Sequence, residues 1–170
     1  MDQNNPTLNQ TSQIMQTTQP ESVRDLTVSD LTRNGACLAF FTAYDDLDTA
    51  RMIGLAAPDA TVHFLPLGDD GRGSFWEFGK VVWDLLIDCF PDLTNSVDRL
   101  HTEGDTRDSG AITANVTISG TQAKEFMGIA PKGLRFNSDH VFVFRFNEAD
   151  QIQHLTVNWD HARFVEQLGS

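Results

Sequence analysis

Apolar residues recur in the first part of the chain with the spacing of amphipathic helices. Within residues 31–47 they fall at intervals of three or four, which predicts a helix whose start is capped by Ser29 or Asp30. A shorter helix is predicted over residues 49–57, because Asp48 stands at an N-cap position and a proline follows the last residue.

The longest helical pattern covers residues 74–90 and ends at Pro91. Apolar side chains occupy most of its circumference, so we expect the rest of the protein to enclose this helix almost completely. Before it, residues 60–65 form a run rich in β-branched and aromatic side chains. Proline and glycine bound this run, which predicts a strand.

After Pro91 the apolar period changes to two, the period of a half-buried strand. Strands are predicted over residues 96–103, 111–119, 134–147 and 151–160. The last two flank a tight turn at residues 147–150, and a short helix over residues 161–168 closes the chain. Helices followed by a run of antiparallel strands indicate an α+β fold.

Composition adds an aromatic excess to this outline. Twelve Phe and three Trp in 170 residues exceed what one small core needs. We therefore expect a curved sheet around the helices, with rings lining an apolar cavity. Residues 1–21 are rich in Gln, Asn and Thr and bury too little surface to order, so they predict a disordered tail before a single domain over residues 22–170.

Charge and cysteine content exclude several classes of protein. The formal net charge is −12, from 12 basic and 24 acidic residues, and no basic patch interrupts it. Nucleic acid is therefore not an expected partner. No apolar run reaches the roughly 18 residues that a membrane span needs. Cys37 and Cys89 lie far apart in apolar stretches, which predicts buried free thiols and favours a cytoplasmic location.

Four short motifs, in order along the chain, resemble those of one family. Residues 120–133 read GTQAKEFMGIAPKG, similar to the GTHxGxFxGxPPTG signature of SnoaL-like polyketide cyclases, also called ester cyclases. The FPD at residues 90–92, the FRF at residues 144–146 and the QLG at residues 167–169 also resemble family marks.

The resemblance implies the NTF2-like cone, in which a mixed, mostly antiparallel sheet wraps around N-terminal helices to enclose a cavity. It also implies a homodimer and a metal-free, cofactor-independent aldol cyclisation of a hydrophobic carbonyl compound. One aspartate acts there as general acid/base, and Asp160 corresponds to it. Asp160 also precedes the last predicted helix, so an N-cap role is its alternative. A dimer would also cover Val141 and Val143 on the outer side of their strand.

Further site candidates follow from position. His140 shares a strand face with aromatic residues, and there it can relay a proton or polarise a carbonyl group. Its alternative is a solvent-facing histidine. The other candidates are predicted to contact substrate, although each also fits a purely structural role. They are Tyr44, His63, Trp76, Trp83, Gln122, Phe126, Met127, Phe142 and Phe144. No residues stand at metal-ligand spacing, so no metal site is expected.

The sequence leaves three other functions open. The same cone can bind a small ligand or mediate assembly without chemistry. An epoxide hydrolase is disfavoured because the Arg-x-Asp pairing of that chemistry is absent from the sequence. A ketosteroid isomerase-like enzyme fits Tyr44, but Phe64 and Phe142 stand where that family would place its working carboxylates.

Overall fold

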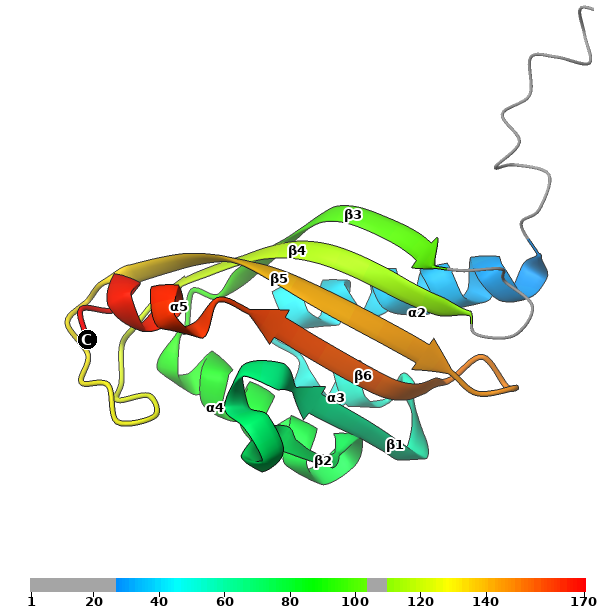
Figure 1. Ribbon diagram of the computed structural model, residues 1–170, viewed down its shortest axis with the longest axis horizontal. Coiled ribbons are helices and arrows are strands. Elements are labelled where there is room, and N and C mark those ends of the chain that lie inside the picture. The colour runs from blue at the N-terminus through cyan, green and yellow to red at the C-terminus, as the bar shows by residue number, and fades with distance from the viewer. Residues whose placement is uncertain (1–26, 104–109) are drawn as a thin grey trace, which may run out of the picture.

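A curved six-stranded sheet forms one layer of the protein, and helices cover its concave face (Figure 1). The computed structural model describes residues 27–103 and 110–170, so the predicted polar tail lies outside the described residues. The strands are β1 (Ala56–Phe64), β2 (Arg72–Ser74), β3 (Thr94–Glu103), β4 (Ala111–Thr121), β5 (Arg135–Phe146) and β6 (Ile152–Trp159).

The strand order is β2-β1-β6-β5-β4-β3. Only the β1–β6 pair is parallel; the other four pairs are antiparallel. This arrangement confirms the predicted α+β class and the mixed, mostly antiparallel sheet. The short strand β2, which pairs with the edge of β1, is an element that the sequence patterns missed.

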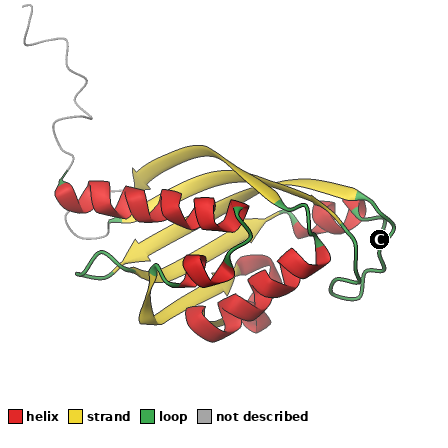
Figure 2. Ribbon diagram, turned by 180° about the vertical axis from the view of Figure 1, so that it is seen from behind, coloured by secondary structure: helices red, strands yellow, loops and turns green. Residues whose placement is uncertain are grey.

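The helices divide between the concave face and one end of the sheet. They are α2 (Val28–Asp45), α3 (Thr49–Ile53), α4 (Lys80–Cys89) and α5 (His161–Gln167). A 3₁₀ segment (Leu65–Gly71) and a π-helical turn (Phe75–Gly79) connect β1, β2 and α4. Helices α2, α3 and α4 lie against the concave face, and α5 packs beside β5 (Figures 1 and 2).

The start of the first helix corrects the predicted cap. The N-cap is Thr27, not Ser29 or Asp30, and the helix begins at Val28. The Thr27 hydroxyl accepts a hydrogen bond from the Asp30 backbone N–H at 3.1 Å, and the Asp30 carboxylate accepts one from the Thr27 N–H at 2.9 Å. Asp30 is thus the N3 residue of a capping box, which satisfies two otherwise free N–H groups.

Two further helix predictions need correction. The second helix has the predicted cap, Asp48, but ends at Ile53, because Ala56 already pairs with Ile152 of β6. The prediction that the rest of the protein encloses the long helix almost completely is wrong: on α4, Val81 and Leu85 are 64% and 43% exposed. Only one side of α4 packs inward, so its other apolar side faces solvent.

Aromatic rings fill the space between α2 and the sheet. Phe40 is fully buried, and its ring lies within 6.3 Å, centroid to centroid, of six others. Both cysteines are free and buried, as predicted, and burial raises the pKa of Cys37 to about 12.

Candidate functional site

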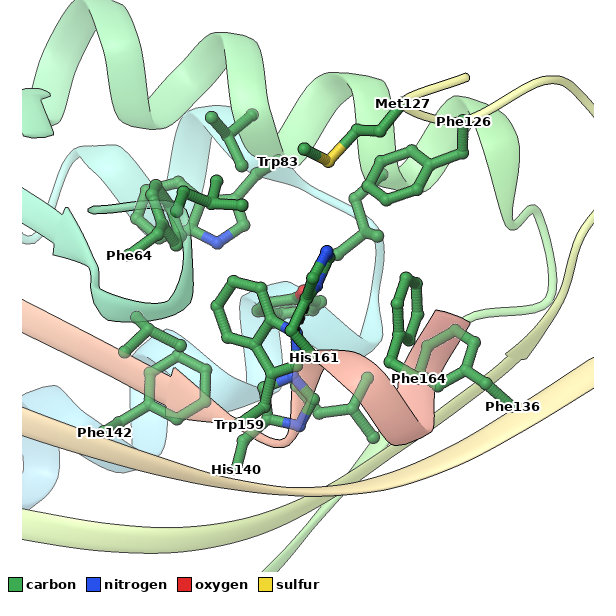
Figure 3. Close-up of a pocket in the computed structure, with 16 residues that line it drawn as sticks. Phe64, Trp83, Phe126, Met127, Phe136, His140, Phe142, Trp159, His161 and Phe164 are labelled. Carbon is green, nitrogen blue, oxygen red and sulfur yellow. Dashed lines mark hydrogen bonds between the residues drawn. The ribbon is translucent and has the colours of Figure 1, made fainter. Parts of the chain in front are cut away.

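An apolar pocket opens on the concave side of the sheet, between α4, α5 and the inner face of β5 and β6 (Figure 3). Its volume is about 70 Å³. Sixteen side chains line it: Tyr44, Phe64, Leu67, Val82, Trp83, Leu86, Ile118, Phe126, Met127, Phe136, His140, Phe142, Val157, Trp159, His161 and Phe164.

Alternation along the strands explains the apolar wall. On β5, Phe136, His140 and Phe142 point inward and line the pocket, whereas Val141 between them is 37% exposed on the outer face. On α4 the lining residues Val82, Trp83 and Leu86 follow helical spacing. Among these lining residues, no carboxylate or amide side chain is present.

A tight hairpin forms part of the rim. Phe126 and Ile129 exchange both backbone hydrogen bonds, at 3.1 and 2.9 Å, around Met127 and Gly128. Both central residues have positive φ, 47° and 79°, as a type I′ turn requires. Positive φ favours glycine, but the first central residue is Met127, so the backbone of this turn is strained at the mouth of the pocket. Phe126 is buried, and Met127 is half exposed above the pocket.

His140 is held as a hydrogen-bond acceptor toward the pocket. Its Nδ1 lies 3.1 Å from the carbonyl oxygen of Ser138. Since a carbonyl oxygen only accepts, Nδ1 carries the proton and Nε2 has a free lone pair. In the described part of the chain Nε2 has no hydrogen-bond partner. Burial lowers the pKa of His140 to about 4, so this imidazole is neutral at pH 7.

Trp159 and His161 form a second polar unit on the same wall. The indole Nε1 of Trp159 donates to Nδ1 of His161 at 3.2 Å. The His140 ring stacks on Trp159, with centroids 5.5 Å apart and planes 21° apart. Figure 3 shows the His161 ring projecting from the start of α5 into the pocket region between Met127 and Trp159.

Tyr44 is the one hydroxyl-bearing side chain among the lining residues. The side chain comes from the last turn of α2, is 2% exposed and lines the pocket. Its hydroxyl makes no hydrogen bond within the described residues. Burial raises the pKa of Tyr44, so the hydroxyl keeps its proton and can donate it to a bound oxygen atom.

Asp160 lies between two pocket residues but faces away from the pocket. Its carboxylate accepts a hydrogen bond from the Arg163 backbone N–H at 3.0 Å and caps α5, and the residue is exposed. It borders a shallow hollow formed with Arg163 and Glu166 of α5. The structure therefore gives Asp160 the cap geometry and does not bring it together with His140.

The other predicted substrate contacts divide into two groups. Tyr44, Trp83, Phe126, Met127 and Phe142 line the pocket together with His140. Four other candidates, His63, Trp76, Gln122 and Phe144, do not line it.

The four candidates outside the pocket have other contacts. His63 contacts Gly68 and Arg72 on the outer face of the sheet edge. Trp76 is 41% exposed and donates to the Ala57 carbonyl. Phe144 packs between Phe40 and Phe41.

Gln122 is a buried side chain that hydrogen-bonds to the backbone of the rim hairpin. It is 2% exposed, and its Nε2 donates to the carbonyl oxygens of Lys124 and Ile129 at 3.0 and 2.7 Å. The side chain thus fixes the loop that carries Phe126 and Met127 instead of contacting the pocket itself.

Sequence reasoning missed Trp159 and His161 as site residues. Both flank Asp160, and adjacent residues at a strand-to-helix turn point in different directions. The signal that could have found them is the alternation itself: Val157, Trp159 and His161 stand two apart and all line the pocket. Phe136 and Phe164 were also missed, although each is an aromatic residue on the inner face of its element.

Residues 27–103 and 110–170 carry neither a cluster of metal ligands nor a membrane-spanning helix. Within these ranges no three His, Cys, Asp or Glu side chains converge as a metal site. In the same described ranges, no helix combines the length and apolarity that crossing a bilayer requires.

Solved structures define the class of fold. AclR from Streptomyces galilaeus superposes with a TM-score of 0.67 at 23% identity, over 81% of this chain and 95% of its own. IdmH from Streptomyces antibioticus superposes with a TM-score of 0.66 at 24% sequence identity, over 81% of this chain and 99% of its own. A protein with a ketosteroid isomerase-like fold from Catenulispora acidiphila superposes with a TM-score of 0.62 at 14% sequence identity, over 79% of this chain and 92% of its own. These likenesses establish an NTF2-like fold, as predicted.

The family follows from the sequence. Residues 36–168 match the family model of the SnoaL-like polyketide cyclases, so the chain belongs to that family. This confirms the resemblance that the four motifs carry. No curated protein matches the chain.

Proposed function

We propose that the protein binds a hydrophobic, carbonyl-bearing small molecule in the pocket and catalyses cofactor-independent acid/base chemistry on it, of the polyketide or ester cyclase type. One observation supports the proposal: the few polar groups of this apolar pocket include an acceptor, His140 Nε2, and a donor, the Tyr44 hydroxyl, that have no partner among residues 27–103 and 110–170. Small-molecule sites combine apolar walls with a few placed polar groups in this way.

The size of the pocket sets a condition on binding. A cavity of about 150 Å³ holds one benzene molecule, and this pocket has about 70 Å³. A ligand with one or more rings must therefore displace part of the wall. Met127 is the side chain that can move at least cost, because it is 53% exposed and its unbranched chain is flexible.

The chemistry proposed is removal of a proton from the carbon next to the carbonyl group. The C–H bond breaks, its proton passes to Nε2 of His140, and the electron pair shifts onto the carbonyl oxygen, which the Tyr44 hydroxyl stabilises by a hydrogen bond. The resulting enolate can attack a second carbonyl carbon in the same molecule, which is an aldol cyclisation, and the proton on His140 then passes to the alkoxide oxygen that the attack leaves. His140 replaces Asp160 as the proposed base because its lone pair faces the pocket.

Deuterium exchange into 1-tetralone tests this chemistry without the natural substrate. The protons beside its carbonyl exchange with D₂O through the enolate, and NMR follows their loss. The wild-type protein should accelerate the exchange. His140→Gln, which cannot accept a proton, should reduce the acceleration by roughly 10²- to 10⁴-fold, the usual contribution of a general base.

The low pKa of His140 favours a second candidate function, ligand binding without catalysis. An imidazole with a pKa of about 4 is a weak base. In that case 1-tetralone binds, but its exchange rate matches that of the free compound, and the catalytic proposal fails. His154→Gln on the outer face of the sheet serves as the matched histidine control.

We also propose a homodimer formed through the outer face of the sheet. Along β5 this face presents Asp139, Val141, Val143 and Arg145 in order, with an acid at one end, two valines in the middle and a base at the other end. Asp98 lies near Asp139, since the Thr117 hydroxyl oxygen is 2.6 Å from a carboxylate oxygen of Asp98 and 3.3 Å from one of Asp139.

Two copies related by a two-fold axis through the valines would place the acidic end of each face against the basic end of the other. Val141→Arg should convert the dimer to monomer in sedimentation velocity. A wild-type protein that remains monomeric at micromolar concentration contradicts this part of the proposal. We place the protein in the cytoplasm, and its two free buried thiols support that location.

A further inference from the structure

We propose that Trp159, anchored by His161, positions the imidazole of His140 and holds its Nε2 toward the pocket. Trp159 and His161 are then positioning residues, and His140 is the group that removes the proton. This inference rests on the proposed function, because it concerns the geometry of the proposed base. It adds two residues, the last of a strand and the first of a helix, that act through that base.

The imidazole of His140 needs a second support besides its own hydrogen bond. Nδ1 lies 3.1 Å from the carbonyl oxygen of Ser138, two residues earlier on the same strand. This contact acts at the base of the ring, whose plane has a broad range of rotation about the bond to Cβ. Nε2 is at the far end of the ring, so rotation displaces it more than it displaces the base. The face of the ring must therefore rest against another side chain.

Trp159 supplies that face from the neighbouring strand. His140 of β5 and Trp159 of β6 are directly paired residues, and both line the pocket. Their rings stack, with centroids 5.5 Å apart and planes 21° apart. The Phe142 ring, next along the same face of β5, is also close to His140, with centroids 6.2 Å apart. The indole against its face limits how far the imidazole can rotate.

His161 in turn fixes the indole of Trp159. The Trp159 Nε1 donates to Nδ1 of His161 at 3.2 Å, and since an indole N–H only donates, Nδ1 is the acceptor. The His161 ring stacks on Phe164 one turn further along α5, with centroids 6.0 Å apart and planes 23° apart. The hydrogen bond therefore ties the indole to a ring that is itself packed on the helix.

The turn from strand to helix sets the order of these contacts. Trp159 ends β6, Asp160 caps α5 by accepting from the Arg163 N–H, and His161 begins that helix. Figure 3 shows the rings of His140, Trp159 and His161 next to one another. Within the described residues the Trp159 ring contacts both histidine rings, and no ring contact joins the two histidines directly. An effect of His161 on the His140 ring therefore passes through the indole.

NMR of the histidine rings, without any ligand, tests the positioning. In the wild-type protein at pH 8, long-range ¹H–¹⁵N spectra should show the Nδ1–H form alone for His140. His161→Leu, which cannot accept the indole hydrogen bond, should shift the His140 ring nitrogens toward the average of the two tautomers. His161→Asn should restore the wild-type spectrum of His140, because its Oδ1 can accept in place of Nδ1.

Two tryptophan substitutions form a matched pair in the same experiment. Trp159→Phe keeps an aromatic face beside His140 but removes the indole N–H, so it should change the His140 spectrum as His161→Leu does. Trp76→Phe removes an indole N–H outside the pocket, which donates to the carbonyl oxygen of Ala57 at 2.9 Å. This control should leave the His140 spectrum unchanged.

Deuterium exchange into 1-tetralone measures the consequence for the chemistry. His161→Leu should lower kcat about tenfold with a smaller change in KM, because misplacing a catalytic group by 1 Å can cost roughly 10²-fold in rate. His161→Asn should recover most of this loss. In a protein that already carries His140→Gln, His161→Leu should have no further effect on kcat, because a positioning residue acts only through the base that it positions.

The outcomes separate the inference from the proposed function. An unchanged His140 spectrum in either His161→Leu or Trp159→Phe overturns the inference and leaves the proposed function intact. A further loss of kcat when His161→Leu is added to His140→Gln also overturns it, since His161 then acts on the ligand itself. If the wild-type protein does not accelerate exchange but the spectra change as expected, the proposed chemistry fails and the positioning of His140 stands.

Discussion

Two aromatic regions lie on the same concave face, and only one of them leaves space. Five of the six rings around Phe40 meet it edge to face, and Phe40, Phe75 and Phe144 are fully buried. Ten ring-bearing side chains, Trp159 and two histidines among them, line the other region, yet they enclose a pocket of about 70 Å³. Aromatic content alone therefore does not decide whether a region becomes a core or a binding site.

The difference lies in what covers the sheet. Helix α2 packs along β3 and β4, so its own side chains fill the space beneath it. The pocket is instead bounded by side chains from separate elements: Leu86 of α4, His161 of α5 and Phe126 of the rim hairpin. A continuous helix fills a concave surface, whereas separate edges leave room that a ligand can use.

Truncating one phenylalanine in each region tests whether one region is a packed core and the other a pocket, because the two losses in the free energy of unfolding should differ. Phe40→Ala should lower the free energy of unfolding by about 3 to 5 kcal/mol, because it leaves a cavity among packed rings. Phe126→Ala should cost about half as much, since its ring already faces open space on one side. Urea denaturation measures both, and equal losses would contradict the distinction between core and pocket.

The pH dependence of stability should come more from the pocket than from the outer face. The folded-state pKa of His140 is about 4, below its ordinary value of 6.5, with burial as the main cause. The unfolded chain therefore takes up a proton first. The contribution is fully present above pH 6.5 and is lost as the pH falls toward 4, by roughly 3 kcal/mol.

His140→Gln should abolish that part of the acid sensitivity in urea titrations at pH 7, 5.5 and 4. His154→Gln is the control on the outer face, where burial and then Arg145 lower the pKa of His154. If His140→Gln and His154→Gln lose equal stability toward acid, His140 is not the buried neutral group described above.

The smallest effect is expected at Asp160. Asp160→Asn should change the free energy of unfolding by only a few tenths of a kcal/mol, because Asn caps helices about as well as Asp. It should leave the exchange of 1-tetralone protons unchanged, since the carboxylate lies outside the pocket. A hundredfold loss of exchange in this variant would return the base to Asp160.

The fold was largely predictable from the sequence, and the site only partly. A period of two located four of the six strands, and a β-rich run bounded by proline and glycine located a fifth, because such patterns are typical of strands with one face on the core. They missed β2, whose three residues are too short to show a period. They also extended the second helix too far, because its end is set by the distant pairing of Ala56 with Ile152.

The polar wall of the site was harder to predict for a physical reason. Whether Asp160 or its neighbours face the pocket depends on the turn from β6 into α5, which a one-residue shift reverses. The tautomers of His140 and His161 depend on contacts with Ser138 and Trp159. The direction of Asp160 is set by local backbone geometry, and the histidine tautomers are set by which groups lie beside the two rings. Neither feature leaves a periodic pattern in the sequence.

The central claim, that a carbonyl-bearing ligand occupies this pocket, is tested most directly by two neighbouring substitutions on α4. Leu86 lines the pocket, whereas Leu85 is 43% exposed and does not line it. Calorimetric titration with 1-tetralone should show binding to the wild-type protein and to Leu85→Trp, and none to Leu86→Trp, whose indole fills the space. Equal binding to Leu85→Trp and Leu86→Trp would contradict the assignment of the pocket as the site.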